Sequence, residues 1–434
     1  MKELSTTPSA TAEPAPTATT LHIPGPSSVT LTKSRSGWSC IDDNRLRNNL
    51  FAAVGFLELA NAGDFAANVW NEVPVPIYAI VFMAIGGCSA FVLSICAFSD
   101  SRKALHNIKF LKNQRKVLKG SDGDLSRDTL VEVTKRELRI EMINRWLMDL
   151  LMGGGAMLIS IGTFMAIGGA NRKVWFASNI LSGYLGNAPI ALFGLMSAVW
   201  AIMVVAKMNA HLTVARKELQ GSPALPVLRQ RCFNVQVFFI VNGASNVLGG
   251  VGSMLTAERW WGYVILIPVI ISSIFCNIWW RHRVGYDRPF IPTAPSMTLD
   301  TITEALETSS QLRLSIQDGA GIDLETIFGG PAGLKEVLEF FVKHDLFEQF
   351  AFRLVTNKHV RDLFVKNEDL SADISVDGIL ATGEEHHATI LDIALTFLKK
   401  HGPRHMLHRE RFLLEILGTY LVEQKRSQTI TVEK

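Results

Sequence analysis

The sequence predicts an all-α membrane protein: a polytopic bundle of six transmembrane helices, arranged as three helical hairpins, followed by a cytosolic all-α carboxy-terminal domain. The clearest observation is a stretch without charged residues between Trp260-Trp261 and Trp279-Trp280, which is rich in Ile, Val, Leu and Phe. As a helix this stretch is about 25 Å long, and indole rings favour the water–lipid boundary. Five further stretches resemble it, and the mean hydropathy of +0.21 is high for a soluble protein.

Residues 1–36 differ in composition from the rest of the chain. They are dense in Ser, Thr, Pro and Ala and hold almost no large apolar side chain. Such a segment cannot offset the entropy cost of ordering, so we expect a disordered cytosolic amino terminus. No apolar segment follows Met1-Lys2, which argues against a cleavable signal peptide. The first span is therefore expected to act as its own insertion signal.

Six stretches come close to the ~20 residues that a helix needs to cross hydrocarbon. The first is the least regular, because Glu58 and Asp64 lie inside it. An alternative is a chain with five spans whose first stretch lies on the membrane surface, which would move the amino terminus to the other side. The predicted spans, within a transmembrane domain of residues 37–281, cover residues 48–70, 76–98, 146–169, 183–206, 233–255 and 260–280.

The distribution of Lys and Arg predicts the orientation. With the amino terminus inside, the inner segments from Lys33 to Arg288 carry twenty-four of these residues, and the outer connections carry only Arg172, Lys173 and Arg259. Positive charge accumulates on the cytosolic side of membrane proteins, so both termini are expected in the cytosol. The organelle is not indicated.

The inner connections, residues 99–145 and 207–232, have the mixed charge of solvated helices, so we expect both to extend the spans into the cytosol as helices. Basic residues in the first connection could contact anionic lipid headgroups, although ordinary positive-inside bias explains them at least as well. These residues are Lys109, Lys112, Arg115, Lys116 and Lys119.

The first, third and fifth spans each gather polar or small residues on one helical face. Unpaired polar groups in hydrocarbon cost several kcal/mol, so these faces are expected to turn toward one another. One interpretation is helix packing, in which small residues allow close approach and Asn or Ser side chains bond across helices. The other is a polar path or solute site with Glu58 as the proton- or cation-binding group. The candidate residues are Glu58, Asn61, Asp64, Ser160, Asn242, Ser245 and Asn246.

After Trp280 the chain changes character. Residues 282–295 contain three prolines and predict a stiff linker, and residues 296–434 hold no membrane-length apolar run but several apolar residues at helical spacing. They predict a small helical domain in the cytosol. Its histidines at 401, 405 and 408 are interpreted as solvated, because Gly402-Pro403 is expected to interrupt their helix.

The chain carries no motif of a nucleophilic, phosphate-binding or dinucleotide-binding site, so no catalytic residue, cofactor or metal is expected. A net charge of +3 indicates no nucleic-acid partner. The leading hypothesis is a non-enzymatic membrane anchor or sensor whose cytosolic helical domain binds a protein partner. The alternative is a small-solute or ion transporter or channel with a polar path between the first, third and fifth spans.

Overall fold

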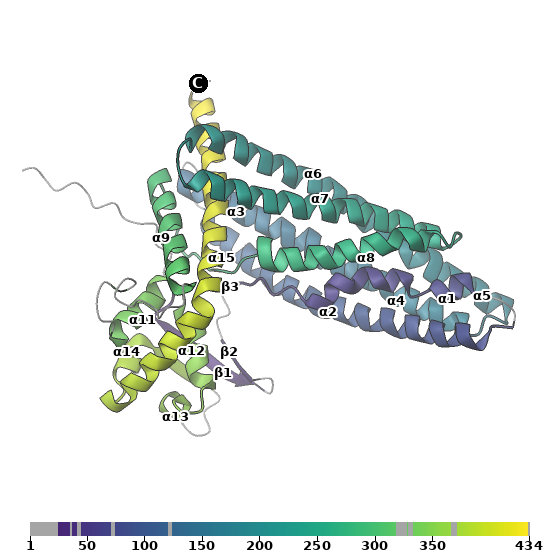
Figure 1. Ribbon diagram of the computed structural model, residues 1–434, viewed down its shortest axis with the longest axis horizontal. Coiled ribbons are helices and arrows are strands. Elements are labelled where there is room, and N and C mark those ends of the chain that lie inside the picture. Colours follow the sequence, from purple (N-terminus) through teal and green to yellow (C-terminus); the bar gives the residue numbers. More distant parts are fainter. Residues whose placement is uncertain are drawn as a thin grey trace, which may run out of the picture.

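The structure, a computed structural model, describes residues 25–34, 37–40, 45–70, 74–119, 124–317, 328, 333–365 and 371–432. These residues are mostly helical, as the sequence predicts. A long bundle of helices meets a smaller domain at one end (Figure 1). We call this end of the bundle the junction end and the opposite end the distal end.

Five helical stretches in the described part of the chain are long and apolar enough to cross a membrane, and each contains or overlaps one of the last five predicted spans. The stretches are Ile77–Leu118, Leu125–Ala166, Arg172–Glu218, Ala224–Thr256 and Gly262–Val284. Their elements are α2 (Ile77–Leu118), α3 (Leu125–Ile140), η2 (Glu141–Leu147), α4 (Met148–Ala166), α5 (Arg172–Asn179), η3 (Ile180–Leu185), α6 (Asn187–Glu218), α7 (Ala224–Thr256), α8 (Gly262–Trp279) and η4 (Trp280–Val284).

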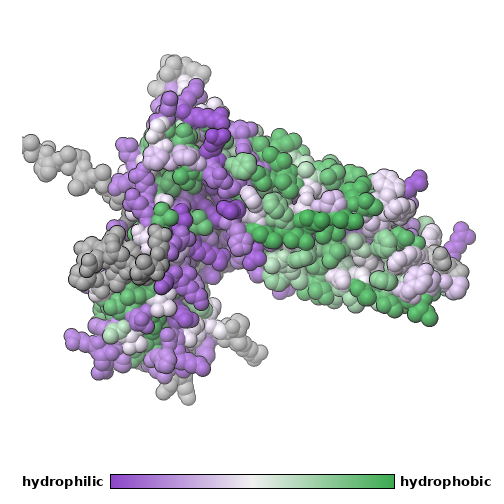
Figure 2. Space-filling view, in the orientation of Figure 1, coloured by the Kyte–Doolittle hydropathy of each residue, from purple (hydrophilic) through white to green (hydrophobic). Residues whose placement is uncertain are grey.

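The outside of the bundle is apolar over much of its length. Ile85 on α2, Leu195 on α6 and Ile271 on α8 are 57%, 65% and 63% exposed. Figure 2 shows this apolar surface over the bundle, whereas the domain at the junction end is largely hydrophilic. Soluble monomers rarely expose so continuous an apolar surface, so the bundle is compatible with a multi-pass membrane protein.

The predicted first span, residues 48–70, is not one regular helix. It consists of the 3-10 helix η1 (Ala52–Ala62) and the short helix α1 (Phe65–Val69). Gly63, between them, lies so close to the α2 backbone at Gly86 that neither position has room for a Cβ. Glycine pairs allow such close approach of two backbones.

The η1–α1 segment runs antiparallel to α2. Near the junction end the Phe51 amide donates a hydrogen bond to Asp100 Oδ1 at 3.0 Å. Near the distal end the Trp70 and Tyr78 rings lie 5.5 Å apart, edge to face. The segment therefore follows the length of the bundle on its way to the start of α2.

Both predicted helical connections are present at the junction end. α2 continues to Leu118 and α3 begins at Leu125, so the two helices form a hairpin beyond the apolar surface. α6 continues to Glu218, and α7 begins at Ala224. These extensions form the base on which the carboxy-terminal domain lies.

The carboxy-terminal domain is helical around a core of its own, in which Phe341, Phe347 and Phe350 are fully buried. α15 starts in this core and then continues along the junction end of the bundle, where it packs against α3 and α6 (Figure 1). The elements of the carboxy-terminal domain are α9 (Leu299–Gln317), α11 (Leu334–Lys343), α12 (Phe347–Thr356), α13 (Arg361–Phe364), β5 (Ser371–Ser375), α14 (Val376–Leu380) and α15 (Glu384–Val432).

A small sheet joins the amino-terminal segment to this domain. β1 (Ser28–Ser34) lies between β2 (Gly37–Cys40) and β5 and pairs antiparallel with both. Val29 and Leu31 alternate with polar residues and are buried in the domain core. The predicted disorder of residues 1–36 therefore does not hold for β1, while residues 1–24 and 35–36 lie outside the described part. The strands are short, and the described residues are mostly helical, so the all-α class fits.

The segment predicted as a stiff linker, residues 282–295, is partly buried in the interior. β3 (Arg45–Leu46) pairs with β4 (Arg288–Pro289), and Arg288 is 2% exposed. Ile291 lies in the apolar core that the bundle base shares with α15. The prolines predicted a stiff linker. Instead, an ion pair between Arg288 and Glu137 holds this segment inside, and Glu137 lies far away in the sequence.

Candidate functional site

Two groups of polar residues could carry a function: the predicted residues inside the bundle and a cluster of charges at its junction end. Among the first, Glu58 in η1 is 2% exposed. Asn61 Nδ2 donates a hydrogen bond to Glu58 Oε2 at 2.6 Å. A Cβ at Gly249 of α7 would come within 3.3 Å of the Glu58 carboxylate, so this glycine makes room for it.

Asp64 bonds to α8. The Tyr263 hydroxyl donates to Asp64 Oδ1 at 2.8 Å, and Asn68 Nδ2 donates to Asp64 Oδ2 at 2.9 Å. The same Asn68 nitrogen lies 2.8 Å from the Tyr263 oxygen. This small network ties α1 to α8.

Ser160 and Asn246 are buried as predicted, and each bonds to an adjacent helix of the bundle. Ser160 Oγ donates to the Gly87 carbonyl of α2 at 2.8 Å, and Asn246 Nδ2 donates to Ser197 Oγ of α6 at 2.7 Å. Ser245 is also buried, at 8% exposure. Both are hydrogen bonds between helices, which typically contribute about 1 kcal/mol each.

Asn242 faces a cavity of about 60 Å³ near the junction end. Asn144, Asn277 and Trp280 line the same cavity. The side-chain amide of Asn144 is buried there without a hydrogen-bond partner among the described residues. A polar cavity of this size has room for a few water molecules.

The second group is centred on Glu415 of α15, which is 2% exposed. Its carboxylate bridges two arginines: Arg136 of α3 contacts Oε2, and Arg231 of α7 lies 2.8 Å from Oε1. Arg231 also donates to the Val284 carbonyl of η4 at 2.7 Å. Burial raises the pKa of Glu415, but the two guanidinium charges outweigh it and lower that pKa to about 2. Glu415 is therefore ionised and connects α3, α7 and α15.

A second buried ion pair lies beside it. Arg288 Nη2 lies 2.5 Å from Glu137 Oε2, and the Tyr286 hydroxyl donates to Glu137 Oε1 at 2.7 Å. The Arg288 guanidinium stands 5.3 Å from the Phe110 ring centroid and 5.2 Å from that of Phe412, positions suited to cation–π contacts. This pair holds the segment after η4 between α2, α3 and α15.

A third buried ion pair, Arg145–Asp100, joins two elements of the bundle. Arg145 Nε and Nη2 donate to the two oxygens of Asp100 at 2.9 and 3.0 Å, a bidentate arrangement between η2 and α2. On α15, Arg411 donates to the carbonyl of Gly285 at 2.7 Å. The junction end is thus held by charges as well as by apolar packing.

These ion pairs could not be predicted from the sequence, because their partners lie far apart in the chain. Glu415 is separated from Arg136 by 279 residues and from Arg231 by 184. A single sequence shows that each residue is charged but not which one it meets. A faint signal was available in Glu415, whose neighbours Leu413, Leu414, Ile416 and Leu417 are all apolar.

The histidines at 401, 405 and 408 of α15 are arranged differently from the expectation. α15 continues through Pro403 as one helix, so His401, His405 and His408 share it. His408 is 5% exposed, and His405 Nε2 lies 2.8 Å from the His344 carbonyl. Within the described residues, no group of three or more His, Cys, Asp or Glu is placed to hold a metal ion.

The basic residues predicted to contact anionic headgroups lie around a surface groove of about 480 Å³ on the end of α2. At 1.5 Å per residue, Lys109 lies about 13 Å beyond Asp100 along the helix axis. Contact with headgroups stays a prediction. The residues of the groove are Lys109, Lys112, Asn113, Arg115, Lys116, Lys119 and Leu138.

Comparisons of the chain with protein-family models, with curated proteins and with solved structures found no match.

Proposed function

We propose that the protein is a non-enzymatic multi-pass membrane protein whose bundle serves as anchor and sensor for a cytosolic helical domain that binds a protein partner. The observation that carries the proposal is the buried Arg136–Glu415–Arg231 bridge. It joins the long helix of the domain to two helices of the bundle without a flexible connection. A displacement of the membrane-spanning helices that shifts α3 or α7 at the junction end would therefore move α15.

We also propose that η1 and α1 make a sixth crossing and that both termini lie in the cytosol. β1 pairs with β5, so the amino-terminal segment and the domain lie on one side of any membrane. Five crossings would separate them, whereas six bring them together. η1 has 11 residues and at about 2.0 Å per residue spans about 22 Å, and α1 adds to this length.

Photo-crosslinking of the full-length protein in native membranes tests the partner. Phe352 on α12 is 42% exposed, and Phe176 on α5 at the distal end is 60% exposed and serves as the matched control. With benzoylphenylalanine at Phe352 we expect an adduct with a soluble protein, and none with the same residue at Phe176. The same crosslinker at Leu363, which is 38% exposed on α13, is a second probe of the domain. The proposal is wrong if Phe352 and Phe176 give the same adducts, or if neither Phe352 nor Leu363 gives an adduct.

A solute or ion conduit is the second candidate, and one observation favours it. Glu58 is a buried carboxylate in a span that is an irregular helix, and broken helices with an acidic residue are common where transporters bind their substrate. The bonds of Ser160 and Asn246 to adjacent helices favour packing instead. Proton flux in reconstituted vesicles that is lost in Glu58→Gln would establish the conduit, and equal flux in both proteins, or none, would exclude it.

A further inference from the structure

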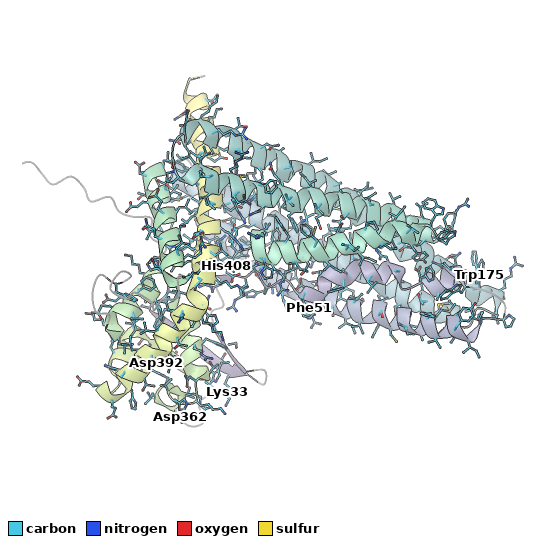
Figure 3. All side chains as sticks on the ribbon, viewed as in Figure 1. Lys33, Phe51, Trp175, Asp362, Asp392 and His408 are labelled. Atoms are coloured by element: carbon cyan, nitrogen blue, oxygen red, sulfur yellow. The ribbon has the colours of Figure 1, made fainter. Side chains whose placement is uncertain are left out.

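A polar recess of the junction that the proposed function does not use lies where the amino-terminal segment meets α12 and α15. Its volume is about 290 Å³, near the lower limit for pockets that hold small organic ligands. Figure 3 labels His408, which lines the recess, on α15 near the end of the bundle. The lining residues are Arg45, Arg47, Asp287, Glu348, Gln349, His401, Arg404, His405 and His408.

The two carboxylates of this cavity are already engaged by the protein. Glu348 lies 3.6 Å from Arg45 and 3.4 Å from Arg47. Asp287 lies 3.3 Å from His408 Nδ1, and its other oxygen accepts from the Asn48 amide. Glu348 is therefore compensated by two arginines, and both oxygens of Asp287 have partners within the protein.

Arg404 is in the opposite situation. It is exposed at the cavity wall, and among the described residues no carboxylate pairs with it. Gln349 and His401 lie beside it as further hydrogen-bond donors. A guanidinium without an internal partner is a natural binding group for a planar or tetrahedral anion.

Cationic side chains act on two of the histidines, His401 and His405. Burial and the charges of Lys400, Arg353 and Arg404 hold the pKa of His401 below its usual value. Burial, with the charges of Arg45 and Arg409, lowers the pKa of His405 to about 3. The charges that act on His401 are all cations, although two carboxylates line the cavity.

We infer that this cavity binds a small phosphorylated anion, with Arg404 and His401 contacting the phosphoryl oxygens. The low volume excludes a nucleic acid or an extended peptide, and the engaged carboxylates argue against a cation. A neutral His405 has its Nε2–H directed at the His344 carbonyl, so its Nδ1 is an acceptor for a hydroxyl group. A phosphate ester of a small polyol combines both features. This inference does not depend on the protein partner proposed above.

The test is calorimetric titration of the full-length protein in nanodiscs of phosphatidylcholine, at neutral pH and in buffer without phosphate. The probes are inorganic phosphate and glycerol 3-phosphate, with glycerol as the uncharged control. The variants are Arg404→Gln, Arg404→Lys and, as matched control, Lys399→Gln, an exposed residue on the same helix outside the cavity lining. Thermal unfolding of each variant reports whether it is folded.

We expect saturable binding of glycerol 3-phosphate, weakened about tenfold or more by Arg404→Gln and less than about twofold by Lys399→Gln. Arg404→Lys should restore part of the loss, because the charge remains. The inference is wrong if neither phosphate probe binds, if glycerol binds equally well, or if both neutralising variants weaken binding alike.

Nanodiscs that contain phosphatidic acid distinguish the source of the phosphoryl group. Loss of glycerol 3-phosphate binding in these nanodiscs, together with its retention in phosphatidylcholine, would identify a lipid headgroup as the ligand. Unchanged binding in both would identify a soluble phosphate ester. Either result supports the recognition of a phosphoryl group by this cavity.

Discussion

Replacing Glu415 with Gln tests whether buried charge holds the domain to the bundle. The change removes the negative charge between Arg136 and Arg231, which are 6% and 5% exposed. Arg231 keeps its carbonyl partner in η4, but two nitrogens of Arg136 already lack one in the described part of the chain. Two guanidinium charges would then be buried without compensation.

Two independent estimates give the magnitude. Breaking a buried ion pair by removing one partner costs about 3–5 kcal/mol. The fall of the Glu415 pKa from 4.5 to about 2 corresponds to about 3 kcal/mol at about 1.4 kcal/mol per pKa unit. This stabilisation is complete above pH 4.5 and is lost as the pH falls toward 2, because the folded state keeps the carboxylate ionised.

The assay is unfolding of the full-length protein in detergent, followed by tryptophan fluorescence, together with limited proteolysis of α15. Glu385→Gln on the same helix is the matched control, since the side chain of Glu385 is 80% exposed. A change of less than about 0.5 kcal/mol is expected for it. If Glu415→Gln also stays within this range, the buried bridge does not hold the domain and the reasoning is refuted.

The triple variant Arg136→Met, Glu415→Leu and Arg231→Met distinguishes the effect of buried charge from that of side-chain packing. Replacing a whole buried ion group by apolar residues is often neutral or stabilising, so this variant should be more stable than Glu415→Gln. If it is less stable, hydrogen-bond geometry rather than charge compensation determines the docking of α15.

Three further predictions use the same unfolding assay. The pKa of His405 falls from 6.5 to about 3, so the stabilisation from its neutral form should be fully present above pH 6.5. At pH 5 the free energy of unfolding should be lower by about 2 kcal/mol, and His405→Gln should reduce this loss. Equal pH profiles of the two proteins would contradict this prediction. Gly418→Ala should cost about 1–3 kcal/mol, because its Cβ would lie 2.5 Å from His211 Nδ1, whereas Gly383→Ala, whose nearest neighbour would be 3.5 Å away, should be close to neutral. Asn246→Leu should cost about 1 kcal/mol without changing vesicle permeability, and altered permeability would favour a conduit instead.

The sequence predicted the parts of the fold that depend on composition and local period. Five of the predicted spans coincide with membrane-length helices, because lipid requires long apolar segments whose backbone bonds are satisfied internally. The extension of α2 to Leu118 and the start of α3 at Leu125 followed from mixed charge at helical spacing. The burial of Glu58 and Asn246 followed from the cost of unpaired polar groups in hydrocarbon.

Features that depend on distant partners were not predictable in this way. Val29 and Leu31 are too few to indicate a strand until they are placed beside Ile374 in β5. α15 passes through Pro403 because Leu398 and Met406, on either side, are buried in the same core. Packing on both sides outweighs the loss of one backbone hydrogen bond, and the proline leaves the bend in α15 that Figure 1 shows.

The polar residues divide into two energetic classes, and the division determines where the protein is sensitive to substitution. Inside the bundle, Ser160 and Asn246 bond to an adjacent helix, and each contributes about 1 kcal/mol. At the junction end, Glu415 and Glu137 compensate buried arginines, where removing one partner costs about 3–5 kcal/mol. The coupling that we propose between bundle and domain would therefore be most sensitive to a few charges at the junction, which act together with the apolar core that α15 shares with the bundle base.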